Sequence, residues 1–234
     1  MRITVFCENT LETPEVFDVY PEGLGKGIAN VFGKDTNLVV QEKGADGKEL
    51  LNYLDETDVL VWWGHCYHGF VSDEVVDKVC ARVHSGMGLM VLHSGHVSKP
   101  FKRLMGTTGA LRWRESGENE RLWCINPSHP ICEGLGEYVD IKKEETYGEA
   151  FDIPTPDELV FIGWFSGGEV FRAGCVFNRG AGKVFYFNPG HETFPTYKNA
   201  KIKKIMKNAA KYICPKKALK YPVCTNPPAP QKKR

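Results

Sequence analysis

The first hundred residues alternate short apolar runs with longer segments in which apolar positions recur at helical spacing. The runs are apolar on both faces and predict strands at residues 3–6, 38–41, 59–63 and 89–92. The longer segments predict helices at residues 21–32, 46–53, 73–84 and 99–105. Ser72 offers an N-cap oxygen to the third helix, whose apolar stripe consists of Val75, Val76, Val79 and Val83. This alternation predicts a parallel sheet that helices cover on both sides.

The second half of the chain has a different pattern, with strand-like runs that follow one another closely. These runs lie at residues 123–125, 138–141, 159–165, 170–177 and 184–187. Residues 178–182 have the composition of a hairpin turn, and residues 199–213 predict a basic amphipathic helix. We therefore expect one α/β domain over residues 1–214, with a mostly parallel central sheet and an antiparallel extension. Residues 215–234 read as a Pro/Lys-rich C-terminal tail.

Charge and composition narrow the class of protein further. The 234 residues include 30 basic and 29 acidic side chains, a formal net charge of +1, which argues against a dedicated nucleic-acid or anionic-membrane binder. The apolar runs are far shorter than the roughly 20 residues that span a bilayer, and the N-terminal segment meets a charge too early for a signal peptide. We expect a cytoplasmic protein with reduced cysteines, a small-molecule partner, no nucleic acid and no membrane. Exposed aromatics such as Phe70, Phe194 and Tyr197 suit a homo-oligomer or packing over the site.

Three histidines follow three of the predicted strands. His65 follows the run at 59–63, His93 the run at 89–92 and His191 the run at 184–187. Because ligands of open α/β sheets gather at the carboxyl ends of the strands, we expect these side chains to meet. They are candidate ligands of Zn²⁺ or another divalent transition metal. The alternative is metal-free acid–base chemistry, and no nucleotide cofactor is expected.

Further candidates lie near these histidines in the sequence. We expect catalytic roles for His93, His191, Glu192, Glu149 and Tyr147, with Glu145 and Asp152 as additional carboxylates in a loop that closes over the site. Substrate contacts are expected from His96, Trp63 and Ser94. A single histidine is more often a hydrogen-bonded packing residue, which is the competing interpretation of His96 and His68. Ser94 follows a strand and precedes a helix, which is the position of the serine in a nucleophile elbow, but its surroundings lack the full Gly-x-Ser-x-Gly pattern.

At these residues the chain resembles the ThuA family (trehalose utilisation protein). The matching segments are DVLVWWGH at 58–65, GMGLMVLHSGH at 86–96, FKRLMG at 101–106, SHPI at 128–131, ETYGE at 145–149, GEVFRAG at 168–174 and PGHET at 189–193. The resemblance implies a flavodoxin-like, class I glutamine amidotransferase-like three-layer sandwich. Those amidotransferases carry a catalytic cysteine after a central strand, where this chain has His93 and Ser94. A glutaminase that works through a thioester is therefore disfavoured.

The resemblance also implies a role in the utilisation of trehalose-like disaccharides. We expect an enzyme that acts on a sugar or 3-keto-sugar at the histidine-rich edge of the sheet. The alternative is a non-catalytic sugar-binding or regulatory protein that keeps the amidotransferase-like scaffold. Bound metal and turnover distinguish the two hypotheses.

Overall fold

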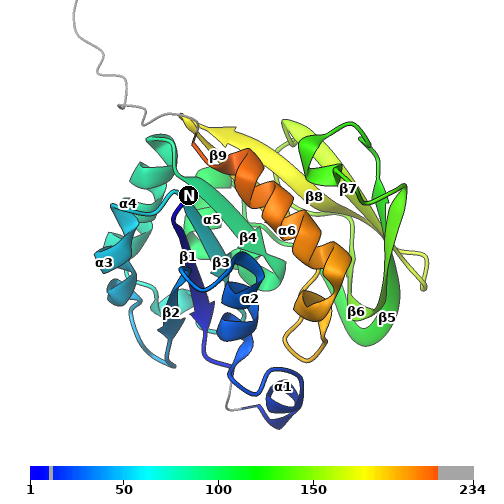
Figure 1. The fold of residues 1–234 in the computed structure, drawn as a ribbon, viewed down its shortest axis with the longest axis horizontal. Helices are drawn as coiled ribbons and strands as arrows, with labels where there is room; N and C mark the ends of the chain where they lie inside the picture. The colour runs from blue at the N-terminus through cyan, green and yellow to red at the C-terminus, as the bar shows by residue number, and fades with distance from the viewer. Residues whose placement is uncertain (11–12, 216–234) are drawn as a thin grey trace, which may run out of the picture.

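The computed structural model describes residues 1–10 and 13–215, which form a continuous nine-stranded sheet in the order β2-β1-β3-β4-β9-β8-β7-β5-β6 (Figure 1). The first five strands in this order, from β2 to β9, pair in parallel with their neighbours. They are β1 (Ile3–Glu8), β2 (Asn37–Gln41), β3 (Val59–Trp63), β4 (Gly88–Leu92) and β9 (Gly182–Phe187). The side chains of β1, β3, β4 and β9 are almost all buried, because helices cover both faces, whereas the edge strand β2 is partly exposed.

The antiparallel part of the sheet has four strands, which are longer than the five strands of the parallel part. Its strands are β5 (Arg112–Cys124), β6 (Tyr138–Gly148), β7 (Glu158–Phe165) and β8 (Val170–Arg179), and β8 pairs with β9 to join the two parts. The sequence predicts the extension correctly but makes it too small, since β5 begins eleven residues before the predicted 123. Residues 144–148 belong to β6, which corrects the predicted closing loop.

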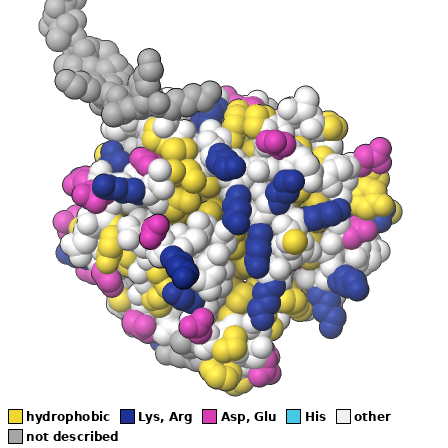
Figure 2. Space-filling view, in the orientation of Figure 1, with side chains coloured by type: hydrophobic (Ala, Val, Ile, Leu, Met, Phe, Trp, Pro, Cys, Tyr) yellow, Lys and Arg dark blue, Asp and Glu magenta, His cyan; other side chains and the backbone are white. Residues whose placement is uncertain are grey.

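Helices pack on both faces of the parallel strands (Figure 1). On the near face α2 (Leu24–Phe32) packs beside α6 (Ala200–Ile213), while α4 (Asp73–His84) packs against α3 (Leu51–Leu54) and α5 (Lys99–Met105). A short helix α1 (Pro14–Val19) precedes α2. Figure 2 shows lysine and arginine side chains gathered over α6, whose apolar residues are buried against the sheet. This is the solvated basic face that the amphipathic pattern predicts.

Several predicted bounds differ from the structure for local reasons. The helix predicted at 21–32 begins at Leu24, and the one predicted at 46–53 divides into a 3₁₀ turn (Lys48–Leu50) and α3. Ser72 lies at the N-cap of α4, but its side chain makes no capping hydrogen bond. None of the seven cysteines in the described residues forms a disulfide, and the predicted tail from 216 onward lies outside them. Within the described ranges there is no helix with the length and apolar content needed to cross a membrane.

The buried carboxyl of Glu120 in β5 yields a pH prediction. Its Oε1 accepts one hydrogen bond, from the Asn188 side chain at 3.1 Å. Burial raises the pKa of Glu120 well above its usual value, and the charge of Glu144 adds to this. The folded state therefore keeps a proton that the unfolded chain releases above the ordinary glutamate pKa, so the stability contribution is full at low pH and falls as the pH rises.

Glu120→Gln is therefore expected to raise the free energy of unfolding at pH 8 by about 1–3 kcal/mol, with a smaller gain at pH 5. The substitution keeps a neutral acceptor for Asn188 and removes the ionisation. Urea unfolding at both pH values measures the effect. Glu137→Gln at an exposed position is the control, with no pH-dependent change expected. An equal loss of stability at both pH values for Glu120→Gln would contradict the assignment of a protonated carboxyl.

Candidate active site

Three histidines lie together at the carboxyl ends of the parallel strands. His65 follows β3, His93 follows β4 directly, and His191 lies shortly after β9. The ring centroids are 6.4 Å apart for His65 and His93, 5.7 Å for His65 and His191, and 5.5 Å for His93 and His191. The structure therefore brings together the three histidines that the sequence predicts to meet at the carboxyl ends of the strands.

His93 occupies a strained turn at the end of β4. Its backbone φ is 49°, in the left-handed region that few residues other than glycine adopt, and a short 3₁₀ helix (His93–Val97) follows. Its Nδ1 donates a hydrogen bond to the Asn188 carbonyl oxygen at 3.0 Å. Because a carbonyl only accepts, this bond fixes the ring and directs Nε2 into the cluster. The strained turn thus presents an imidazole at the end of a strand, the kind of position at which α/β-hydrolases present their nucleophile.

His93 and Glu145 form a buried pair. The His93 Nε2 lies 2.9 Å from the Glu145 Oε2, and the Tyr147 ring stacks on the His93 ring with centroids 5.1 Å apart. Burial lowers the pKa of His93, but the hydrogen bond and charge of Glu145 outweigh this and bring the pKa to about 8. Burial likewise raises the pKa of Glu145, but its bond to His93 brings it below the usual value. At neutral pH the pair is an imidazolium and a carboxylate.

His65 and Glu192 form a second pair across the cluster. The His65 Nδ1 lies 2.9 and 3.2 Å from the two Glu192 carboxylate oxygens. This hydrogen bond raises the pKa of His65. Burial raises the pKa of Glu192, but His65 and the charge of His191 lower it to about 2. The His65 side chain is 36% exposed, so solvent reaches the cluster beside it.

His191 lies between the two pairs. Its Nε2 is 3.6 Å from the Glu115 Oε1 and 3.8 Å from the Glu192 Oε2. Its Nδ1 accepts a hydrogen bond from the Thr193 backbone N–H at 3.3 Å and lies 2.9 Å from the Thr193 hydroxyl, so the neutral ring carries its proton on Nε2. Burial lowers the pKa of His191. A neutral imidazole therefore lies next to the His93 imidazolium.

The loop that carries His191 is held by the buried carboxylate of Glu144. One Glu144 oxygen accepts from the backbone N–H of His191 at 3.0 Å, and the other from the N–H of Gly190 at 2.9 Å. The Thr196 hydroxyl donates to the same carboxylate at 2.8 Å. Burial raises the pKa of Glu144, and these donors together with the charge of His93 offset part of that rise. Glu144 thus positions the His191 backbone, and both of its oxygens already accept hydrogen bonds.

The cluster contains donors of the type that transition metals bind. Within the described residues, two sets of three ligand atoms lie within 4.8 Å of one another: His65, His191 and Glu192, and His93, Glu145 and His191. Each set combines imidazole nitrogens with one carboxylate oxygen, a combination found in zinc sites. The three histidines expected as ligands are divided between the two sets, which share His191.

Of the other predicted residues, Tyr147 lies in the cluster and His96 lies behind it. The Tyr147 hydroxyl is 3.4 Å from the His93 Nε2. The His96 Nδ1 donates to the Gly109 carbonyl at 2.7 Å, and its ring packs against Tyr147. Burial lowers the pKa of His96 to about 4, so this ring is neutral. The structure thus places the His96 ring in a packing environment behind Tyr147, and its substrate contact stays a prediction.

Trp63, Ser94 and Glu149, which the sequence also selects, bond to groups outside the histidine cluster. The Trp63 indole is fully buried and donates to the Gly190 carbonyl at 3.0 Å, so it fixes the loop before His191 and presents no face to a ligand. The Ser94 hydroxyl donates to the Gly64 carbonyl at 2.6 Å. The Glu149 carboxylate is bound by the Arg172 guanidinium, with an Nε–Oε1 distance of 2.8 Å. Each side chain has a structural partner outside the histidine cluster.

Two acidic residues that contact the cluster lie outside the predicted catalytic and metal-binding set. The sequence indicates Glu145 only as a nearby carboxylate and gives no indication for Glu115. Both lie on the β5–β6 hairpin, whose far end bends over the histidines. The sequence signal for this acidic pair is weak, because the same strand also carries Asp140, Lys142 and Lys143.

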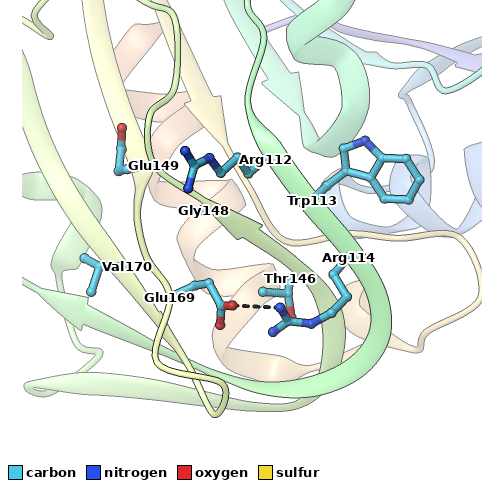
Figure 3. Close-up of a pocket in the computed structure, with 8 residues that line it drawn as sticks. All are labelled: Arg112, Trp113, Arg114, Thr146, Gly148, Glu149, Glu169 and Val170. Carbon is cyan, nitrogen blue, oxygen red and sulfur yellow. Dashed lines mark hydrogen bonds and ion pairs between the residues drawn. The ribbon is translucent and has the colours of Figure 1, made fainter.

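A separate hollow of about 390 Å³ lies beside the end of the same hairpin (Figure 3). Arg114 and Glu169 form an ion pair across it at 2.7 Å. Its lining residues are Arg112, Trp113, Arg114, Thr146, Gly148, Glu149, Glu169 and Val170. Glu149 therefore lines this hollow and is paired with Arg172.

Comparisons with known proteins agree with the fold. A family model described as ThuA, trehalose utilisation, matches residues 22–213. A ThuA-like protein from Parabacteroides merdae has a TM-score of 0.67 and 15% identity, with 91% of this chain and 89% of that chain covered. A protein described as cytoplasmic from Salmonella typhimurium has a TM-score of 0.56 at 11% identity, covering 92% and 100%. A glutamine amidotransferase from Thermotoga maritima has a TM-score of 0.55 at 12% identity, covering 91% and 98%. No curated protein matches the sequence.

Proposed function

The chain belongs to the ThuA (trehalose utilisation) family, and on that premise we propose that it is an enzyme acting on a trehalose-like disaccharide or its 3-keto form. The observation that carries this proposal is the pair of histidine–glutamate contacts, His93–Glu145 and His65–Glu192, on either side of His191. A protein that only binds a sugar does not need neighbouring histidines whose pKa values are shifted in opposite directions. The family description supplies the substrate class, and the cluster supplies the reactive groups.

Acid–base chemistry follows from the opposite pKa shifts of neighbouring rings. His93, with a pKa of about 8, carries a proton that it can donate at neutral pH. His191, whose pKa burial lowers, is neutral and can accept one. Groups with pKa values separated in this way suit the acid and base roles of one reaction. Glu145 and Glu192 orient the rings and stabilise their charged forms.

The same residues fit a divalent transition metal such as zinc. His191 would hold it together with His65 and Glu192, or together with His93 and Glu145. The bond from the His93 Nδ1 to a backbone carbonyl is the kind of outer contact that orients metal-binding histidines. When bound, such an ion would polarise a sugar carbonyl or lower the pKa of a water molecule. The chain offers no residue pattern that calls for a nucleotide cofactor.

The proposal is tested by measuring metal content and turnover on the same preparation. We expect about one equivalent of zinc or a similar metal by mass spectrometry, and conversion of trehalose or 3-keto-trehalose that a chelator reduces. His191→Ala is expected to lose both, and His84→Ala, at the end of α4, is the matched control. Turnover without metal would favour the acid–base form. Sugar binding with neither metal nor turnover would support the non-catalytic alternative, and ammonia release from glutamine would contradict both.

A further inference from the structure

An exposed tryptophan lies at the start of β5, next to the strand that covers the histidines. Trp113 is 66% exposed and pairs across the hairpin with Tyr147. Residues that pair directly across antiparallel strands point to the same face, with Cβ atoms about 5 Å apart. Because the Tyr147 ring stacks on His93, the Trp113 indole projects from the face that covers the cluster.

The alternation of side chains along β5 supports this orientation. Glu115, two residues after Trp113, reaches to 3.6 Å from the His191 Nε2. Arg114 lies between them and points the other way, where it pairs with Glu169. Figure 3 shows the Trp113 indole projecting to the opposite side of β5 from Arg112 and Arg114. Trp113 and Glu115 thus form an outer rim on the cluster side of the hairpin.

We propose that Trp113 is a stacking platform for a pyranose ring of the substrate, which places a second sugar ring beside the one that reacts at the cluster. This proposal rests on the proposed function and specifies its substrate as a pyranoside of at least two rings. Pyranoses present an apolar face of C–H groups that packs on aromatic rings, while their hydroxyls hydrogen-bond to nearby carboxylates. Glu115 supplies such a carboxylate beside Trp113. The sugar ring that packs on Trp113 lies outside the cluster. The proposal therefore concerns substrate binding and does not change the roles of the histidines and glutamates.

A second exposed tryptophan provides the matched control. Trp164 in β7 is 48% exposed and pairs across strands with Arg121. Arg121 binds Asp140, so this indole lies among groups that do not contact the histidines. Trp164→Ala also removes an exposed tryptophan side chain, but it leaves the rim of Trp113 and Glu115 unaltered.

Isothermal titration with trehalose tests the platform on the full-length protein. Trp113→Ala is expected to weaken trehalose binding about tenfold, whereas Trp113→Phe keeps it within about threefold and Trp164→Ala leaves it unchanged. Metal content and oligomeric mass are expected to stay the same in all variants. Unchanged affinity in Trp113→Ala, or a loss of subunit association, would overturn the platform alone. Failure of the unaltered protein to bind trehalose would overturn the proposed function as well.

Discussion

Replacing His93 with asparagine is expected to lower turnover of the disaccharide by about a thousandfold, within the range that general acid–base groups contribute. The side chain supplies a proton donor whose pKa is raised to about 8 and is one candidate metal ligand. Asparagine is preferred to alanine as the test because it tolerates the left-handed backbone that His93 adopts. Steady-state kinetics with trehalose or 3-keto-trehalose measures the loss.

The control for this prediction is His96→Asn. His96 lies behind Tyr147 and bonds to a backbone carbonyl, so its loss is expected to alter stability more than the chemical step. A kcat that falls equally in both variants, or that stays unchanged in His93→Asn, would remove His93 from the reaction. A thermal unfolding curve for each variant separates loss of chemistry from loss of structure.

The parallel half of the fold could be read from the sequence because its signals are local. The strand Val59–Trp63 and the helices Asp73–His84 and Lys99–Met105 match their predictions to the residue, since each has an unbroken apolar run or a stripe with clear ends. The first part of β5 could not be read in this way. Residues 112–119 are mostly polar and are exposed or half-exposed, and they form a strand because they pair with β6.

The same distinction explains which site residues were found. His65, His93 and His191 follow strands whose order and direction the pattern indicates, so their meeting was predictable. The sequence does not show that Glu145, and not Glu149, faces the histidines, because this depends on how the hairpin bends, which is set by pairing between residues distant in sequence. Trp63 and Ser94 lie at the right edge of the sheet, but their polar atoms bond to the backbone. Sequence position alone does not show which way such a group faces.

The substitution with the largest expected effect on stability is Glu144→Gln. The Glu144 carboxylate accepts from the backbone N–H groups of Gly190 and His191 and from the Thr196 hydroxyl, with no exposure to solvent. An amide would turn one accepting oxygen into a donor that faces other donors. We therefore expect the free energy of unfolding to fall by about 2–4 kcal/mol, measured by urea unfolding at pH 7. Glu133→Gln, on the exposed surface, is expected to change it little.

This prediction is opposite in sign to that for Glu120→Gln, although both carboxyls are fully buried and lie on neighbouring strands. Burial raises the pKa of each, but Glu144 has several donors and Glu120 has one. We expect a buried carboxylate to stabilise the fold only where several donors bind it. Neutralising Glu144 then lowers the free energy of unfolding, and neutralising Glu120 raises it. Changes of the same sign in both variants would show that burial outweighs hydrogen bonding here. Because Glu144 binds the His191 backbone, its variant is also expected to lose turnover, whereas Glu120→Gln keeps it.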